Sequence, residues 1–313
     1  MAKPVLALDI GGTKFAAALV DPTGRAISAR RVPTPRAGDV DAEGLWATLT
    51  SLLDQVVGGV EVIDGVGVGS GGPMQWPDGE ISPLNIPGWR DFPLRARLRE
   101  RFPGLPVRVH NDAVCVTVGE HWRGAGRGND NVLGMVISTG VGGGLVLDGR
   151  LIYGSSGNSG HVGHVVADPD GPSCECGGVG CLEAIARGPA IVNWAQQHGW
   201  RREMPGLTAR DVADDASRGD PAALAAYERA GHAAGVALAS VAALCDLEVI
   251  AIGGGVAQAG SLLFDPLHAA YAEHARLDFV RDVRIVPAAL GQDAGLIGAA
   301  ALILAGDRYW SAD

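Results

Sequence analysis

The sequence predicts an α/β protein of two domains, and three observations support this prediction. Short apolar runs typical of strands alternate along the chain with longer segments whose apolar positions have helical spacing. A strand–turn–strand pattern occurs twice, at residues 5–25 and 132–150. The length of 313 residues exceeds the roughly 100–200 residues of a single domain. With 47% hydrophobic residues the chain can build a core, which excludes a disordered protein.

The two repeated segments, VLALDIGGTKFAAALVDPTGR and VLGMVISTGVGGGLVLDGR, each predict a β-hairpin. Each contains an apolar run ending in Ile, a glycine turn, a second apolar run and a closing Gly-Arg turn. They open two related halves of the chain, or they are unrelated hairpins in a sequence with 47 glycines. The remaining predicted elements are helices at 42–58, 92–102, 222–244, 261–276 and 294–305, with strands at Val66–Val68, Val107–Val109 and Glu248–Ile252.

We place the domain boundary near residue 113, where the first half ends, with the last helix crossing back. Residues 1–113 and 295–313 are then expected to form an N-terminal domain, and residues 114–294 a C-terminal domain.

Composition excludes several functional classes. The formal net charge of −10 argues against a nucleic-acid-binding protein, which would carry a basic face. No run of about 18 apolar residues is present, so we expect no membrane span. The start MAKPVLALD lacks the apolar region of a cleavable leader. Five cysteines in so long a chain do not suggest a secreted disulfide framework, and we expect a cytoplasmic enzyme.

Two glycine turns are candidate phosphate sites. The first contains Asp9, Gly11, Gly12, Thr13 and Lys14, and the second, Ser138–Gly144, contains Thr139 and Gly140. Glycines allow backbone N–H groups to surround phosphate oxygens, and Asp9 is suited to hold a hydrated Mg²⁺. Neither turn has the P-loop pattern, and a strand rather than a helix follows Gly144, which argues against a dinucleotide fingerprint. Each turn by itself is equally consistent with a plain hairpin.

A cluster of soft ligands predicts a metal site. His164, Cys174, Cys176 and Cys181 form the pattern H-x9-C-x-C-x4-C, which suits tetrahedral Zn²⁺. Four protein ligands leave no position for a catalytic water, so this zinc would be structural. Space-filling free thiols or a disulfide are the alternatives, and Cys115 and Cys245 are expected to be core residues.

The pair Asn111-Asp112 follows the strand predicted at Val107–Val109. A carboxylate there could accept the proton of an attacking hydroxyl during phosphoryl transfer. The same dipeptide is also typical of a helix N-cap.

The two glycine turns and the cysteine cluster resemble the ROK family (repressors, open reading frames and sugar kinases) over essentially the whole chain. This resemblance implies an actin-like, hexokinase-like fold in which ATP and sugar meet between two α/β domains. It implies that Asp112 is the catalytic base and Asn111 a sugar ligand. By the same resemblance, further sugar contacts come from Gly72, Asn85, Glu183 and His164, which would also bind zinc, while Gly254 and Gly255 would contact the nucleotide. The turn Gly253–Gly255 is otherwise a plain strand-to-helix turn.

One departure from the family bears on the substrate. Glucokinases of the family usually carry Glu where this chain has His161. An imidazole can donate a hydrogen bond to the carbonyl of an N-acetyl group, whereas a carboxylate only accepts. The segment around His161 resembles bacterial N-acetylmannosamine kinases, whereas SPLNIPGW resembles the glucokinase branch. A surface substitution at His161 without a role in specificity is the remaining alternative.

The resemblance therefore predicts an ATP- and Mg²⁺-dependent kinase for the 6-hydroxyl of a hexose or N-acylhexosamine, with N-acetylmannosamine preferred and glucose as the alternative. A sugar-responsive DNA-binding regulator is disfavoured because only eight residues precede Asp9 and the net charge is acidic. A sugar-binding protein without catalysis is disfavoured by the presence of Asp9, Thr13, Asn111 and Asp112. The family suggests a homo-oligomer, either a dimer or a tetramer.

Overall fold

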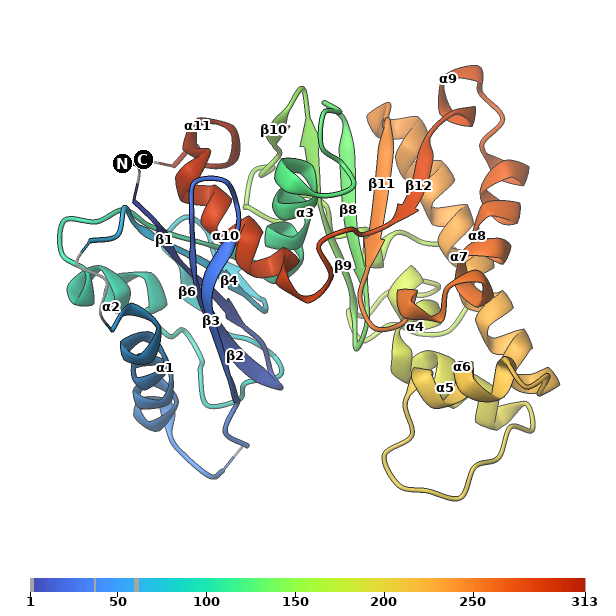
Figure 1. Cartoon of the computed structure of the whole chain (residues 1–313). Coiled ribbons are helices and arrows are strands. Elements are labelled where there is room, and N and C mark those ends of the chain that lie inside the picture. Colours follow the sequence, from blue (N-terminus) through green and yellow to red (C-terminus); the bar gives the residue numbers. More distant parts are fainter. Residues whose placement is uncertain (1–2, 37, 59–61, 313) are drawn as a thin grey trace. The chain divides into compact units, whose positions relative to one another are not determined.

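The chain divides into two compact α/β units in the computed structural model, which describes residues 3–36, 38–58 and 62–312 (Figure 1). The first unit comprises Met1–Gly128, Gly144–Ser159 and Ala289–Asp313, and the second comprises Asn129–Gly143 and Gly160–Ala288. The chain thus passes between the units more than once, and its last helices return to the first unit.

A five-stranded sheet with the order β3-β2-β1-β4-β7 forms the centre of the first unit. Strands β1, β2 and β3 are antiparallel, whereas β1, β4 and β7 run parallel. The bounds are β1 Val5–Ile10, β2 Lys14–Val20, β3 Ala26–Pro33, β4 Val66–Ser70 and β7 Val107–Asn111. The hairpin predicted at residues 5–25 is confirmed as β1–β2, and the predicted strands at 66–68 and 107–109 are β4 and β7.

Helices cover both faces of this sheet, and the helices predicted at 42–58, 92–102 and 294–305 are confirmed with small shifts of their ends. The bounds are α1 Ala42–Val57, α2 Leu94–Arg101, α3 Asp112–Arg123, η3 Gly291–Asp293, α10 Ala294–Leu304 and α11 Gly306–Tyr309. Strands β5 Met74–Gln75 and β6 Glu80–Ile81 form a small separate ribbon.

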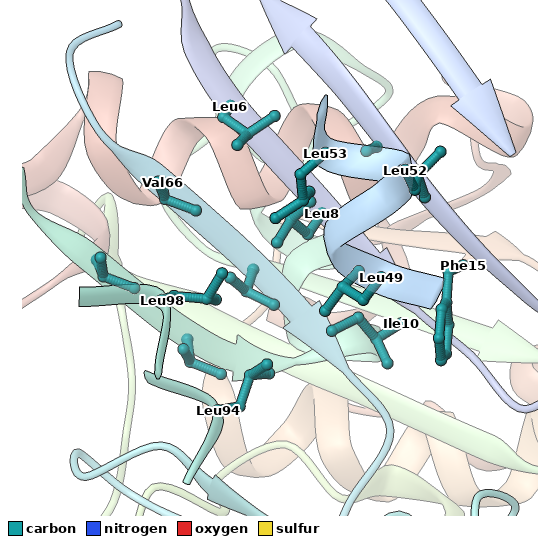
Figure 2. Close-up of a cluster of buried hydrophobic side chains, with 14 of the residues drawn as sticks. Leu6, Leu8, Ile10, Phe15, Leu49, Leu52, Leu53, Val66, Leu94 and Leu98 are labelled. Atoms are coloured by element: carbon teal, nitrogen blue, oxygen red, sulfur yellow. The ribbon is translucent and has the colours of Figure 1, made fainter. Parts of the chain in front are cut away.

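One face of the sheet packs on α1 and α2 through a leucine-rich core (Figure 2). Leu6, Leu8 and Ile10 alternate along β1, as expected for a strand with one face toward these helices. They meet leucines of α1, which begins where the Asp41 side chain accepts a hydrogen bond from Gly44 N at 2.8 Å. The same alternation turns Asp9 toward the opposite face.

That opposite face packs on α10 and α3 at very short range. A Cβ built on Gly67 of β4 would lie 1.8 Å from the carbonyl oxygen of Ala299 in α10. Only glycine fits at such a position, so the sheet and α10 are in backbone contact. This contact places the beginning of α10 beside the carboxyl end of β1.

A second five-stranded sheet has the order β10-β9-β8-β11-β12, which is equivalent to that of the first. The bounds are β8 Val132–Ile137, β9 Val141–Leu147, β10 Arg150–Leu151, β11 Val249–Gly253 and β12 Arg284–Pro287. The predicted hairpin at 132–150 provides β8 and β9, and the predicted strand at 248–252 is β11. The two repeated segments therefore occupy equivalent places in two equivalent sheets, which confirms the internal repeat. Residues 144–151, with the end of β9 and all of β10, are grouped with the first unit.

The helices of the second unit include those predicted at 222–244 and 261–276, which are α7 and α8. They pack closely, since a Cβ on Gly231 of α7 would lie 2.6 Å from the carbonyl oxygen of Leu263. The bounds are η1 Val162–His164, α4 Leu182–Ala186, α5 Gly188–Gln197, α6 Ala209–Ala216, α7 Pro221–Cys245, η2 Ala257–Ala259, α8 Ser261–His274 and α9 Asp278–Arg281. Within the described part of the chain, no helix is long and apolar enough to cross a membrane.

Candidate functional site

In the first unit, the predicted site residues gather at the carboxyl ends of the parallel strands. Ile10, Ser70 and Asn111 are register partners on β1, β4 and β7. Asp9 immediately precedes this row, and Gly72 and Asp112 follow it within two residues. Side chains that follow the carboxyl ends of parallel strands share one edge of the sheet, where α/β proteins bind ligands.

Asp9 is a partly buried carboxylate whose pKa is perturbed. Burial raises its pKa from 3.8 to about 6, and the negative charge of Asp112 acts in the same direction. Lys14 and Arg31 oppose this shift with their positive charges. An oxygen ligand held among groups of both signs suits a hydrated Mg²⁺, so the donor chemistry at Asp9 fits the predicted role.

The turn after β1 is tightly fixed. Gly11 N donates to Lys14 O at 3.1 Å, and Thr34 Oγ1 donates to Gly11 O at 2.7 Å. Thr13 is exposed at the tip of the turn. Gly12 lies against Asn85, because a Cβ built on it would be 2.6 Å from Asn85 Cβ. The predicted phosphate turn is thus in contact with a predicted sugar ligand.

Asn111 and Asp112 begin α3, so the helix-cap interpretation is confirmed. Asn111 Oδ1 and Asp112 Oδ1 both accept from Ala113 N, at 3.0 and 2.8 Å. The cap involves Oδ1 of each side chain. On their other side, Asn111 Nδ2 would be 3.3 Å from a Cβ built on Gly72, and Asp112 Oδ2 would be 4.0 Å from a Cβ built on Gly71. Capping and ligand binding are therefore compatible at both residues.

Gly71 also lies beside Asn85, since its built Cβ would be 3.5 Å from Asn85 Oδ1. Leu84 N donates to Gly72 O at 3.2 Å, which fixes the loop that carries Asn85. Gly71 and Gly72 are thus flanked by Asn85, Asn111 and Asp112, and the structure brings together all the sugar ligands predicted in this unit.

In the second unit, the predicted turn between β8 and β9 lies beside α4. Ser138 N donates to Gly140 O at 2.8 Å, while Thr139 is exposed at the tip. Glu183 of α4 accepts from Val141 N at 2.8 Å, and a Cβ on Gly140 would lie 2.9 Å from the same carboxylate oxygen. Glu183 therefore fixes the turn in this structure.

The predicted nucleotide turn after β11 lies against the same turn. Gly254 has a φ of +96°, and its Cβ would lie 2.3 Å from Ile137 O. A Cβ on Gly255 would be 3.7 Å from Ser138 Oγ, and Val256 N donates to Ile137 O at 3.0 Å. The predicted residues Thr139, Gly140, Gly254 and Gly255 thus form one group. The chain continues into η2 and α8, so a strand-to-helix connection is present as well.

His164, Cys174, Cys176 and Cys181 form a compact cluster whose ligand atoms all lie within 4.8 Å of one another. Cys176 Sγ lies 3.7 Å from Cys181 Sγ, and Cys174 Sγ lies 3.8 Å from His164 Nδ1. Two sulfurs bound tetrahedrally to one Zn²⁺ through bonds of ~2.3 Å would lie ~3.8 Å apart, so the geometry fits the predicted metal. All five cysteines are unpaired by disulfides. Cys115 is buried as expected, whereas Cys245, at the end of α7, is only half-buried.

His161 lies beside this cluster at the start of η1. Its ring centroid is 6.4 Å from that of His164, and the ring planes are inclined by only 14°. Both rings are exposed, and Nδ1 of His164 faces Cys174, which leaves Nε2 on the opposite side of the ring. A metal on Nδ1 and a ligand on Nε2 are therefore compatible.

Two residues near Asp9 were not predicted. Arg31 of β3 acts on the Asp9 carboxylate and forms an ion pair with Asp293 at 2.5 Å. Gly295 of α10 borders Asp9, since its Cβ would lie 3.3 Å from Asp9 Cγ. The small residues of AGLIGAA indicate close helix packing, but no local pattern indicates that the packing partner is Asp9.

Comparisons with known proteins identify similar sequences and structures. The profile of the ROK family matches residues 5–305. A glucokinase of Thermotoga maritima is 34% identical over 312 residues, covering 96% of each chain. An N-acetylmannosamine kinase of Yersinia pseudotuberculosis is 37% identical over 295 residues, covering 94% of this chain and 96% of its own. A ROK family glucokinase from Streptomyces griseus, solved with glucose and AMPPNP, has a TM-score of 0.80 and 33% identity, covering 96% and 99% of the two chains.

Proposed function

Because the chain belongs to the ROK family and has the hexokinase-like two-domain fold of its sugar kinases, we propose that it is an ATP- and Mg²⁺-dependent sugar kinase acting on the 6-hydroxyl of a hexose or N-acylhexosamine. The observation that supports it best is the group of Asp9, Asn85, Asn111 and Asp112 at one edge of the first sheet. Relatives with the two candidate activities align with nearly the whole chain.

Each residue of that group has a distinct part in the proposed reaction. Asn85, Asn111 and the Gly72 backbone hold sugar hydroxyls, and Asp112 accepts the proton of the attacking hydroxyl through Oδ2, the oxygen on the side of Gly71. Asp9 holds hydrated Mg²⁺, which neutralises charge on the transferred phosphoryl group. Gly11, Gly12, Thr13 and Lys14 contribute backbone and side-chain donors for phosphate oxygens.

For the second unit, we propose roles in binding nucleotide and sugar. Thr139, Gly140, Gly254 and Gly255 contact the nucleotide, while His161, His164 and Glu183 contact the sugar. The Cys₃His cluster holds a structural zinc, because its four ligands satisfy a tetrahedral ion and leave no position for a catalytic water. A homo-oligomeric state and a cytoplasmic location remain predictions.

N-acetylmannosamine is the proposed substrate because the exposed His161 ring lies beside His164 and can donate to an acetyl carbonyl. Glucose is the second candidate, because glucokinases at 33–34% identity match the chain over the same extent as the N-acetylmannosamine kinase does.

Release of ADP with N-acetylmannosamine, glucose, N-acetylglucosamine and mannose tests both the proposed kinase activity and the proposed substrate. We expect kcat/KM for N-acetylmannosamine to exceed that for glucose by about tenfold or more. A tenfold preference for glucose would overturn the choice of substrate and leave a kinase. Sugar binding without ADP release from any sugar would instead indicate a regulator or a non-catalytic sugar-binding protein.

The variant His161→Glu tests the cause of this preference. It should shift the ratio of kcat/KM values toward glucose by about tenfold, because a carboxylate cannot donate to the acetyl carbonyl. His274→Glu, at an exposed position on α8, is the matched control and should leave the ratio unchanged.

A further inference from the structure

Glu120, near the end of α3, is a completely buried carboxylate that the proposed reaction does not use. Its Oε2 accepts from Ala125 N at 2.8 Å and from Ala289 N at 3.0 Å, and its Oε1 accepts from Leu290 N at 2.8 Å. Burying an ionised carboxylate is costly unless such hydrogen bonds compensate it. This residue therefore ties two distant segments of the chain together through main-chain atoms.

The second of these segments leads directly into α10. Ala289 and Leu290 precede η3, and α10 follows at Ala294. The neighbouring Gly119 is in backbone contact with the same place, since its Cβ would lie 2.5 Å from Ala294 O. Glu120 and Gly119 thus fix where α10 begins relative to α3.

The beginning of α10 in turn borders Asp9. A Cβ on Gly295 would lie 3.3 Å from Asp9 Cγ and Oδ2, so a shift of the helix start would press on this carboxylate. Leu290, which donates to Glu120, precedes Gly295 by only five positions in the chain. A displacement of the 289–295 segment therefore reaches Asp9 without passing through any residue of the sugar group.

We propose that Glu120 is a positioning residue of the nucleotide site, which holds the Asp9 carboxylate in place through the 289–295 segment. The inference rests on the proposed kinase function, in which Asp9 holds the Mg²⁺ of the nucleotide. The inference predicts different effects on the two ligands. Glu120 affects binding of the Mg²⁺–nucleotide complex and leaves sugar binding at Asn85 and Asn111 unaffected.

Calorimetric titration of Glu120→Gln with MgADP, and separately with the best sugar of the ADP-release panel, tests this separation. The new amide N–H₂ is a donor and must face either Leu290 N–H or the N–H groups of Ala125 and Ala289, which are donors too. The hydrogen bonds on that side of the residue 120 side chain are therefore lost. We expect the Kd for MgADP and the KM for MgATP to rise by about tenfold, within the range that a small misplacement produces. The Kd for sugar alone should stay within about twofold. Equal weakening for both ligands, or an unchanged Kd for MgADP, would overturn the inference.

Gly295→Ala tests the contact between the start of α10 and Asp9, and it provides the test of the inference if Glu120→Gln does not fold. Alanine favours a helix by up to about 1 kcal/mol over glycine, so this variant should remain folded while its methyl group presses on Asp9. It should show the same loss of MgADP affinity with unchanged sugar affinity, and an unchanged MgADP affinity would overturn the inference.

Glu43→Gln, on α1, alters a surface ion pair with Arg97 of α2; it is the matched control and should change neither affinity. If the unaltered protein itself binds no MgADP, the proposed function falls together with the inference. If it binds MgADP and both variants bind equally well, only the inference falls.

Discussion

Gly12 and Asn85 are in direct contact: a Cβ built on the glycine would lie 2.6 Å from both Cβ and Cγ of the asparagine. Gly12 belongs to the proposed phosphate turn, whereas Asn85 is a proposed sugar ligand more than seventy residues away in the sequence. The turn and the sugar ligand therefore cannot move independently, and any side chain at residue 12 must displace Asn85.

Gly12→Ala should raise the KM for sugar by about tenfold, because the added methyl group displaces Asn85 from the hydroxyl it binds. Overpacking of this kind also costs about 1–3 kcal/mol of stability. A double-mutant cycle with Asn85→Gly supplies the check, since removal of the Asn85 side chain relieves the collision. If Gly12→Ala raises the KM equally in the Asn85→Gly background, displacement of Asn85 is not the cause.

Asp112→Asn should lower kcat by about 10²–10⁴-fold while the protein still folds. Asparagine retains an oxygen that can accept from Ala113 N, so the beginning of α3 is preserved, whereas the amide cannot take a proton. ADP release gives kcat, and titration with MgADP shows whether the nucleotide still binds. Undiminished turnover would remove Asp112 from the role of base.

Asp9→Asn should stabilise the protein at neutral pH and leave its stability unchanged near pH 3.8. Burial raises the pKa of Asp9 to about 6, so the folded state favours the protonated carboxyl. In the unaltered protein, the contribution of Asp9 to stability is fully present below pH 3.8, where the carboxyl is protonated. It is lost as the pH rises through 6, which lowers the free energy of unfolding by up to roughly 3 kcal/mol.

Urea unfolding without added Mg²⁺ measures this effect. The difference in free energy of unfolding between Asp9→Asn and the unaltered protein should grow from near zero at pH 4 to about 2–3 kcal/mol at pH 7.5. A difference that does not change with pH would contradict the raised pKa of this carboxylate. The variant should also lose Mg²⁺-dependent turnover.

Cys176→Ser should remove the zinc and, with it, stability and sugar affinity. Metal binding contributes directly to the folding of the loop that carries the ligands, so we expect a loss of at least about 2 kcal/mol and a decrease in Tm of roughly 4–8 °C. Metal analysis should give one zinc per chain for the unaltered protein. Cys245→Ser, at the end of α7, is the control that should retain zinc and sugar affinity. A zinc content unaffected by Cys176→Ser would exclude this cysteine as a ligand.

Local sequence patterns were sufficient for much of the architecture. The two repeated hairpins, the strands that follow α1 and α7, and the long helices are signalled by alternation and helical spacing over 5–25 residues. The Cys₃His cluster was also predictable, because its four ligands lie within 18 residues of chain and the spacing itself restricts the loop. Helix α3 was foreseen only as an alternative, from the capping potential of Asn111 and Asp112.

What the sequence determined by itself is the long helices, the repeated hairpins with their neighbouring parallel strands, and a set of candidate site residues. Only the tertiary structure decided which of them meet. Asp9 is flanked by Arg31 and Gly295 because β3 joins the sheet beyond β2 and α10 returns from the end of the chain to pack on β1. The first of these contacts depends on strand order, and the second on glycine-mediated packing of a helix from the far end of the chain. Local spacing carries no information about either.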